Sequence, residues 1–280
     1  MILQKIDGIE FKLNQPFDFS FLRQYGKVFK VFDDQDSGNI CFGVENEIGK
    51  LFVKFAGAPT AEYRGKTSEA VERLKSTLPI YRSIKQKSLI PFVKAEEIGG
   101  GFAMIFEWCD GECMGRMYES SHKKIMELPI EDKLHIYKDI IDFLKDIASL
   151  GYVAIDFYDG SILYDTLTKR TTICDVDFFR KSPSINDMGQ MWGSSRFMAP
   201  EEYQLGETLD EITNVFTIGQ MGFSLFTDSD RNIENWPLSD ESYQVLMKAI
   251  CPERRDRYSS LATFCESWTQ SIGSQYIKLE

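Results

Sequence analysis

Alternating polar and apolar positions, typical of short β-strands, mark the first hundred residues. Residues 27–32 (KVFKVF) alternate, and two further short runs, ICFGV at 40–44 and LFVKF at 51–55, are rich in β-branched and aromatic side chains. Turn-forming segments separate these runs. The pattern predicts three consecutive strands joined as an antiparallel meander.

A helical period follows the predicted meander. From Ser68 onward, Val71, Leu74 and Leu78 recur at the spacing of one helix face. Pro79 predicts a break in this helix, or the first turn of a second helix. Two more strands are predicted at 92–95 and 102–108, joined across the glycines at 99–101.

Beyond Trp108 the pattern becomes mainly helical. The clearest helix spans 130–150 and ends at Gly151, with two short strands predicted after it near 162–164 and 171–174. Its apolar face is formed by Leu134, Tyr137, Ile140, Ile141, Leu144 and Ile147. The expected fold is therefore α+β, with a small, antiparallel β-rich lobe over 1–108 and a larger α-helical lobe over 109–280 that together form one domain.

Composition narrows the classes of function. Of 280 residues, 43% are hydrophobic and 27% charged, as in soluble globular proteins, and the net charge of −11 argues against a nucleic-acid partner. With no CxxC pair among six cysteines and only two histidines, a zinc cluster is not expected. Without a signal peptide or an apolar run long enough for a bilayer, we expect a cytoplasmic protein with free thiols and no membrane partner.

Four segments, in order, resemble motifs of the protein kinase family. They are LFVKF with Lys54, VAIDFYDGSIL at 153–163 with Asp156, ICDVDFF at 173–179 with Asp175 and Asp177, and GSSRFMAPEEY at 193–203 with Glu201. The resemblance extends from about residue 20 to 270 and implies a two-lobed kinase-like fold. It also implies ATP-dependent phosphoryl transfer to Ser or Thr of a protein, with Mg²⁺ or Mn²⁺ as cofactor.

The resemblance also assigns roles to residues. Lys54 and Gly38 would contact the phosphates of ATP, Asp156 would accept the proton of the acceptor hydroxyl, and Asp175 would bind the metal together with Ser161. The backbone of Glu107, Trp108 and Cys109 would bind adenine in front of Phe106. In supporting roles, Glu72 (alternatively Glu69) would pair with Lys54, and Glu201 with Arg257 (alternatively Arg255). Asp177 completes the motif of Asp175, and Asn214 would orient the backbone of the catalytic loop.

Several positions depart from the family pattern. In DDQDSGN at 33–39 only Gly38 keeps a loop glycine, and Asp33, Asp34 and Asp36 bring carboxylates toward the polyphosphate. Either these side chains point outward, or a cation lies between them and the phosphates, or triphosphate binds badly. The alternative is an ordinary solvated acidic turn. Ser161 replaces the asparagine that holds a second metal ion, and Tyr158 replaces a lysine that balances the charge of the transferred phosphate. Ile155 replaces the arginine that reads an activation-loop phosphate, so such control is not expected.

Three functions remain open at this point. The retained lysine and aspartates favour an active Ser/Thr protein kinase. The departures favour a catalytically weak or inactive pseudokinase that binds nucleotide or a partner. A small-molecule kinase on the same fold is the third.

Overall fold

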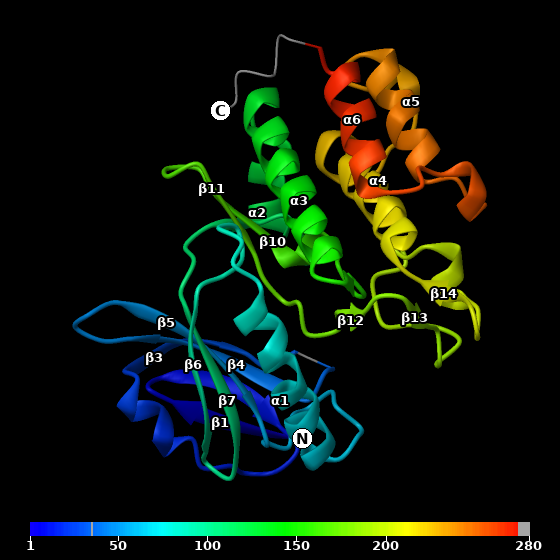
Figure 1. Cartoon of the computed structure of the whole chain (residues 1–280). Helices are drawn as coiled ribbons and strands as arrows, with labels where there is room; N and C mark the ends of the chain where they lie inside the picture. Colours follow the sequence, from blue (N-terminus) through cyan, green and yellow to red (C-terminus); the bar gives the residue numbers. More distant parts are fainter. Residues whose placement is uncertain (35, 274–280) are drawn as a thin grey trace. The chain divides into compact units, whose positions relative to one another are not determined.

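The computed structural model describes residues 1–34 and 36–273. Over these residues the fold is α+β, with antiparallel sheets and six α-helices. The chain divides into two compact units; in Figure 1, where the colours follow the sequence, most of the first unit is blue to cyan and most of the second is green to red. The first unit comprises Met1–Arg82 and Ile90–Cys109, and the second comprises Ser83–Leu89 and the chain from Asp110 onward.

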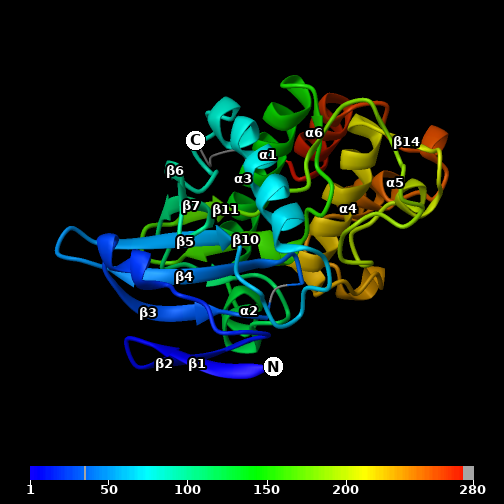
Figure 2. The same cartoon turned by 90° about the horizontal axis from the view of Figure 1, so that it is seen from below.

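A five-stranded antiparallel sheet forms the centre of the first unit. The strand order is β3-β4-β5-β7-β6, and β3, β4 and β5 lie side by side in Figure 2. The meander predicted from the sequence is confirmed, as are the two later strands. The bounds are β3 (Lys27–Phe32), β4 (Asn39–Glu45), β5 (Lys50–Ala56), β6 (Phe92–Ile98) and β7 (Gly101–Glu107).

An additional hairpin precedes this sheet. Strands β1 (Ile2–Ile6) and β2 (Ile9–Leu13) pair around Asp7 and Gly8, which have φ of 48° and 96°. Because both central residues adopt positive φ, the two-residue turn matches the twist of the strands. Phe11 and Leu13 extend into the core that β4 and β5 share.

Helix α1 (Thr67–Ser83) packs against the sheet, and Pro79 lies inside it. The expected break at Pro79 is therefore wrong. Pro79 removes a single hydrogen-bond donor close to the helix end, while Ile80 and Tyr81 beyond it are buried and hold the last turn in place. On the same helix, the hydroxyl of Thr77 lies 3.3 Å from the sulfur of Met104 on β7.

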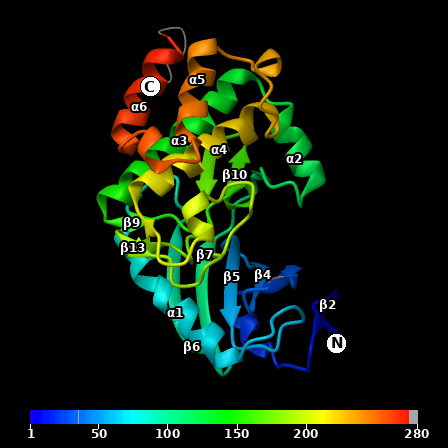
Figure 3. The ribbon, with the colours of Figure 1, turned by 90° about the vertical axis from the view of Figure 1, so that its right-hand side faces the viewer.

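Helices dominate the second unit, as predicted. Four of them group together in Figure 3: α3 (Ile130–Ser149), α4 (Glu211–Thr227), α5 (Asp240–Ala249) and α6 (Leu261–Ser271). All six residues of the predicted apolar face of α3 are buried. Tyr137 of α3 donates a hydrogen bond to the carbonyl of Ile218 in α4 at 2.9 Å and packs edge-on against Trp268 of α6. The remaining helix is α2 (Glu119–Met126).

Short strands fix the loops of the second unit. Strand β10 (Ile162–Asp165) pairs with β11 (Arg170–Ile173) as expected, and also with β8 (Glu112–Cys113). The other pairs are β9 (Tyr152–Val153) with β12 (Arg180–Lys181) and β13 (Ser184–Ile185) with β14 (Thr208–Leu209). The second unit also contains the short 3₁₀ turns η2 (Asp159–Ser161), η3 (Pro200–Tyr203), η4 (Ile233–Asn235) and η5 (Arg254–Asp256). A further 3₁₀ turn, η1 (Ser20–Gln24), belongs to the first unit.

The helices of residues 1–34 and 36–273 are too short or too polar to cross a membrane.

Candidate functional site

The loop between β9 and β10 carries Asp156, the candidate catalytic aspartate. Asn214 of α4 supports the backbone of this loop, because its Oδ1 accepts a hydrogen bond from the N–H of Ala154 at 2.8 Å. This is the contact expected for Asn214. Asp156 itself has a φ of 58°, in the left-handed region that costs energy for a residue with a side chain and that recurs at functional sites.

Asp175, the candidate metal ligand, follows β11 and also lies in the left-handed region, with a φ of 61°. Its neighbour Cys174 donates its N–H to the carbonyl of Ser161 at 2.9 Å. The pairing of β10 with β11 produces this contact. The structure therefore brings together the segments of Ser161 and Asp175, both predicted to bind metal.

Three aromatic rings fasten the two aspartate loops to α3. Phe157, directly after Asp156, lies 5.9 Å from Phe143 of α3 and 6.1 Å from Phe179, measured between ring centroids. Phe179 donates its N–H to the carbonyl of Val176 and closes the turn that contains Asp177, a half-buried residue. The positions of Asp156 and Asp175 thus rest on a shared apolar anchor.

The hydroxyl of Ser161 is the second oxygen donor at the candidate metal site, in addition to the carboxylate of Asp175. Ser161 is fully buried, and its Oγ is a buried oxygen without a hydrogen-bond partner. Buried hydroxyls nearly always have a partner, so this oxygen is able to accept one more contact. Together with the carboxylate of Asp175 it offers the oxygen donors that Mg²⁺ prefers. The two residues fit a divalent cation in chemistry.

Tyr158 occupies the position where the kinase pattern has a lysine. Burial raises the pKa of its phenol well above the usual range, and the carboxylates of Asp175 and Asp156 raise it further. Tyr158 is therefore neutral at physiological pH and can donate a hydrogen bond, but it brings no positive charge.

An ion pair between a partly exposed arginine and a buried carboxylate follows this tyrosine in the structure. Arg196 donates from Nη2 to Asp159 Oδ2 at 2.7 Å, and the side chain of Asp159 is 1% exposed. The remaining oxygen Oδ1 of Asp159 and Nη1 of Arg196 are both buried without a hydrogen-bond partner. Sequence reasoning missed this pair. Although both residues lie in quoted motifs, no spacing rule relates them.

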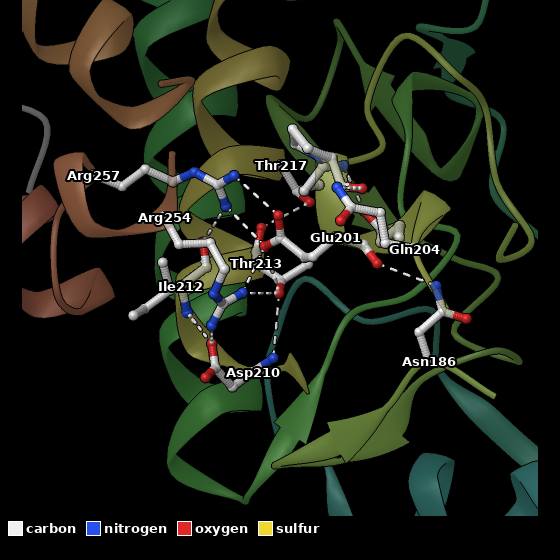
Figure 4. Close-up of polar contacts among 12 residues, drawn as sticks. Asn186, Glu201, Gln204, Asp210, Ile212, Thr213, Thr217, Arg254 and Arg257 are labelled. Atoms are coloured by element: carbon white, nitrogen blue, oxygen red, sulfur yellow. Dashed lines mark hydrogen bonds and ion pairs between the residues drawn. The ribbon is translucent and has the colours of Figure 1, made fainter. Parts of the chain in front are cut away.

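A network centred on Glu201 ties the 193–203 segment to the last helices (Figure 4). Arg257 donates to both carboxylate oxygens of Glu201, at 2.8 and 2.9 Å, so the predicted pair is confirmed. Burial acts to raise the pKa of Glu201, but Arg257 outweighs it and the pKa lies below its usual range.

The second arginine of this network is Arg254, which binds Glu201 at 2.7 Å and Asp210 at 2.8 Å. Arg255, the alternative named from the sequence, is wrong, because its side chain is 84% exposed and pairs with Asp256. Thr213 also donates to Glu201 at 3.0 Å.

A small pocket opens beside Asp156, and Glu202 forms part of its wall. Glu202 is 3% exposed, and its Oε2 accepts the N–H of Ala199 at 2.6 Å. Burial raises the pKa of Glu202 to about 8, and the carboxylates of Glu201 and Asp156 raise it as well. The pocket is lined by Ala154, Asp156, Phe157, Gly193, Ser194, Phe197, Met198, Glu202 and Thr217.

The predicted nucleotide-binding residues belong to the first unit. Lys54 lies on β5 opposite Met104 of β7 and is 8% exposed. Phe106 is buried and contacts the ring of Tyr81 at 4.9 Å between centroids. Gly38 has a φ of 79°, and a side chain there would meet the ring of Tyr63. The glycine is therefore required by its backbone and by its surroundings.

The predicted adenine-binding segment is partly engaged within its own unit. Glu107 donates its N–H to the carbonyl of Pro91 at 3.0 Å, and Trp108 donates to that of Lys50 at 3.3 Å. The ring of Trp108 joins a half-buried aromatic cluster with Phe29, Phe32 and Phe52. Cys109 is half-buried at the end of the unit.

Glu72 does not meet Lys54 in this structure. Its side chain is 76% exposed and pairs with Lys75 at 3.7 Å. Glu69, the alternative, accepts the N–H of Lys66 in the first turn of α1. The residue of α1 that reaches the acidic turn is instead Arg73, which donates to the carbonyl of Ser37. Sequence reasoning did not single out Arg73.

The aspartates of that turn differ in their surroundings. Asp33 accepts the N–H of Lys12 on β2 at 2.6 Å, which fixes its carboxylate toward the hairpin. Asp34 and Asp36 are exposed. Gln35, between them, lies outside the described residues.

No protein-family model matches the sequence.

Proposed function

We propose that this chain is a divergent protein-kinase-like phosphotransferase that transfers phosphate from ATP to Ser or Thr of a protein. One observation carries the proposal. Asp156 and Asp175, picked out by motif, both adopt the left-handed backbone conformation, and the segment after Asp156 is hydrogen-bonded to the residue before Asp175. Such strain persists only where the surrounding structure holds it, and it clusters at functional sites.

In the proposed reaction the two aspartates have separate tasks. Asp156 orients the acceptor hydroxyl and takes its proton. Asp175 and Ser161 would hold a divalent cation, which supplies charge neutralisation on the phosphates when bound. Tyr158 would donate a hydrogen bond to a phosphate oxygen, and Lys54 would contact the phosphates from the first unit. The two units would act as the lobes of a kinase-like domain, with adenine held by the backbone of 107–109.

A second candidate, a nucleotide- or partner-binding pseudokinase, is favoured by a different observation. The side chain of Glu72 is exposed and engaged with Lys75, and Tyr158 supplies no charge. Both features lower the rate expected of phosphoryl transfer, while neither prevents the binding of nucleotide.

A thermal-unfolding titration with ATP and Mg²⁺ or Mn²⁺ tests the site that both candidates share. Ligand at about 100 times its dissociation constant stabilises a fold by about 2.7 kcal/mol. We expect a clear rise in melting temperature for the wild type and a smaller one for Lys54→Ala and Asp175→Ala. An unchanged melting temperature of the wild type with either metal, or equal shifts in all three proteins, would contradict the nucleotide site.

A further inference from the structure

The pocket beside Asp156 has room for a group about the size of a water molecule. Its wall combines two carboxyl groups with two hydroxyl groups, from Asp156, Glu202, Ser194 and Thr217. None of its lining residues is a lysine or an arginine. Both terminal nitrogens of the nearby Arg257 donate hydrogen bonds to the carboxylate of Glu201. The pocket is thus a small space lined by apolar residues together with two carboxyl and two hydroxyl residues, and without a cationic side chain.

In its ionised form, Glu202 offers a second carboxylate oxygen, Oε1, as an acceptor at this pocket. Its Oε2 is used by the N–H of Ala199, whereas its Oε1 has no hydrogen-bond partner among the described residues. Glu202 is 3% exposed and lines the pocket, where a hydrogen-bond donor can approach its carboxyl group.

We propose that this pocket binds a primary ammonium group of the substrate, and that a lysine beside the phosphoacceptor of a polypeptide supplies it. This inference rests on the proposed function and names the substrate class for the same site. An ammonium head has three N–H donors and no acceptor, which matches Glu202, Asp156 and one of the two hydroxyls. Thr217 is able to accept because it already donates to the carbonyl of Thr213, at 3.3 Å. The planar guanidinium of arginine is too large for a space of this size.

The negative charge of the chain also favours an ammonium group as the ligand. The chain carries a net charge of −11, and Tyr158 leaves the catalytic loop without the cation that the kinase pattern has there. A substrate ammonium would restore one positive charge next to Asp156. The lysine would thereby contribute to catalysis as well as to recognition.

Binding of an ammonium group should release a proton. Burial holds the pKa of Glu202 at about 8, helped by Glu201 and Asp156 and opposed by the N–H of Ala199 and by Arg257. Glu202 is therefore mostly protonated at pH 7, and a cation placed against it favours the ionised form. By linkage, the affinity for the ammonium group should rise with pH up to about 8.

Calorimetric titration of the full chain with a matched peptide set tests this inference without requiring phosphoryl transfer. The peptides are Ala-rich with a central serine flanked by lysines, by norleucines or by arginines. The titrations use two amine-free buffers with different heats of ionisation at pH 7. We expect the lysine peptide to bind at least about tenfold more tightly than the other two, with release of roughly one proton per peptide. Equal affinities, or binding without proton release, would overturn the proposal.

Variants localise the effect. Glu202→Gln should abolish both the lysine preference and the proton release, while Glu207→Gln, at an exposed glutamate close by, should keep both. If Glu202→Gln does not fold, the pH dependence of the wild type tests the inference instead. Its affinity for the lysine peptide should rise between pH 6 and pH 8, and an affinity independent of pH would overturn the inference.

A small-molecule arm identifies the source of the ammonium group. n-Butylammonium that displaces the lysine peptide supports recognition of the amine alone, whereas retention of the peptide supports the polypeptide as the source. A preference for lysine in a protein that transfers no phosphate would leave the amine site standing and remove the proposed catalytic function.

Discussion

Asn214 in α4 accepts a hydrogen bond from the N–H of Ala154, with 2.8 Å between Oδ1 and N, and so supports the loop that carries Asp156. Asn214 is fully buried, and its Nδ2 has no hydrogen-bond partner. A carboxylate would present a second acceptor at that position, whereas the amide presents a donor. Asn214 thus keeps one of the two contacts that an aspartate makes possible.

We expect Asn214→Leu to lower the free energy of unfolding by about 1–3 kcal/mol, because the N–H of Ala154 is left buried without an acceptor. Asn214→Asp keeps the acceptor and serves as the matched control. Urea unfolding of both variants measures the difference. A loss in Asn214→Asp equal to that in Asn214→Leu would show that the hydrogen bond to Ala154 is not what matters.

The arginines near Glu201 should differ sharply in their effects. Arg257→Ala leaves Glu201 without the guanidinium that binds both its oxygens and should cost about 3–5 kcal/mol. Arg254→Ala should cost less, since its side chain is 24% exposed and Arg257 still neutralises Glu201. Arg255→Ala should change stability by no more than about 0.5 kcal/mol. Equal losses among the three, measured by urea unfolding, would contradict the network.

Removing Arg196 should destabilise the catalytic loop. The carboxylate of Asp159 is almost completely buried, so Arg196→Ala leaves a buried charge with no counterion and should cost about 3–5 kcal/mol. The double variant Arg196→Ala with Asp159→Asn removes both charges and should recover much of that loss. A double variant no more stable than Arg196→Ala would mean that the ion pair is not the cause.

Glu202 should make stability depend on pH. Its pKa is about 8 in the folded chain and near 4.5 when unfolded, so between these values the folded state holds a proton that the unfolded state has released. The contribution is therefore fully present below about pH 4.5 and is lost as pH rises to 8, by roughly 1.4 kcal/mol per pH unit. Relative to Glu202→Gln, the wild type should lose about 4 kcal/mol between pH 5 and pH 8. Parallel pH profiles of the two proteins would contradict the raised pKa.

Much of the fold was predictable from short-range patterns. The helical face of 130–150 identified α3 because that side of the helix is buried in a core. The run at 27–32 identified β3, although a bulge between Val28 and Lys30 breaks its strict alternation and brings both Val28 and Val31 to the core. The hairpin at the start of the chain was missed, although Asp7-Gly8 between two alternating segments is a strong turn signal. The helix break predicted at Pro79 was wrong, because a proline near a helix end removes only one hydrogen bond and the burial of neighbouring side chains offsets that loss.

The candidate site was predictable only where a motif fixes both residue type and order. Asp156, Asp175 and Glu201 belong to such motifs. Arg254, Arg196 and Glu202 act through partners that are distant in sequence or through burial, and no linear spacing contains that information. The exposed position of Glu72 likewise depends on how α1 is rotated, which Arg73 and its contact with Ser37 help to fix.

Transfer of label from γ-labelled ATP to a serine peptide tests the central claim most directly. We expect slow but measurable transfer by the wild type with Mg²⁺ or Mn²⁺, and none by Asp156→Asn, whose ATP binding stays nearly intact. Asp175→Ala should lose transfer together with metal-dependent nucleotide binding. Ser161→Asn, which supplies a longer ligand arm, should keep or raise the rate. If the wild type transfers no label with either metal, and Ser161→Asn combined with Tyr158→Lys does not restore transfer, the chain is not a phosphotransferase.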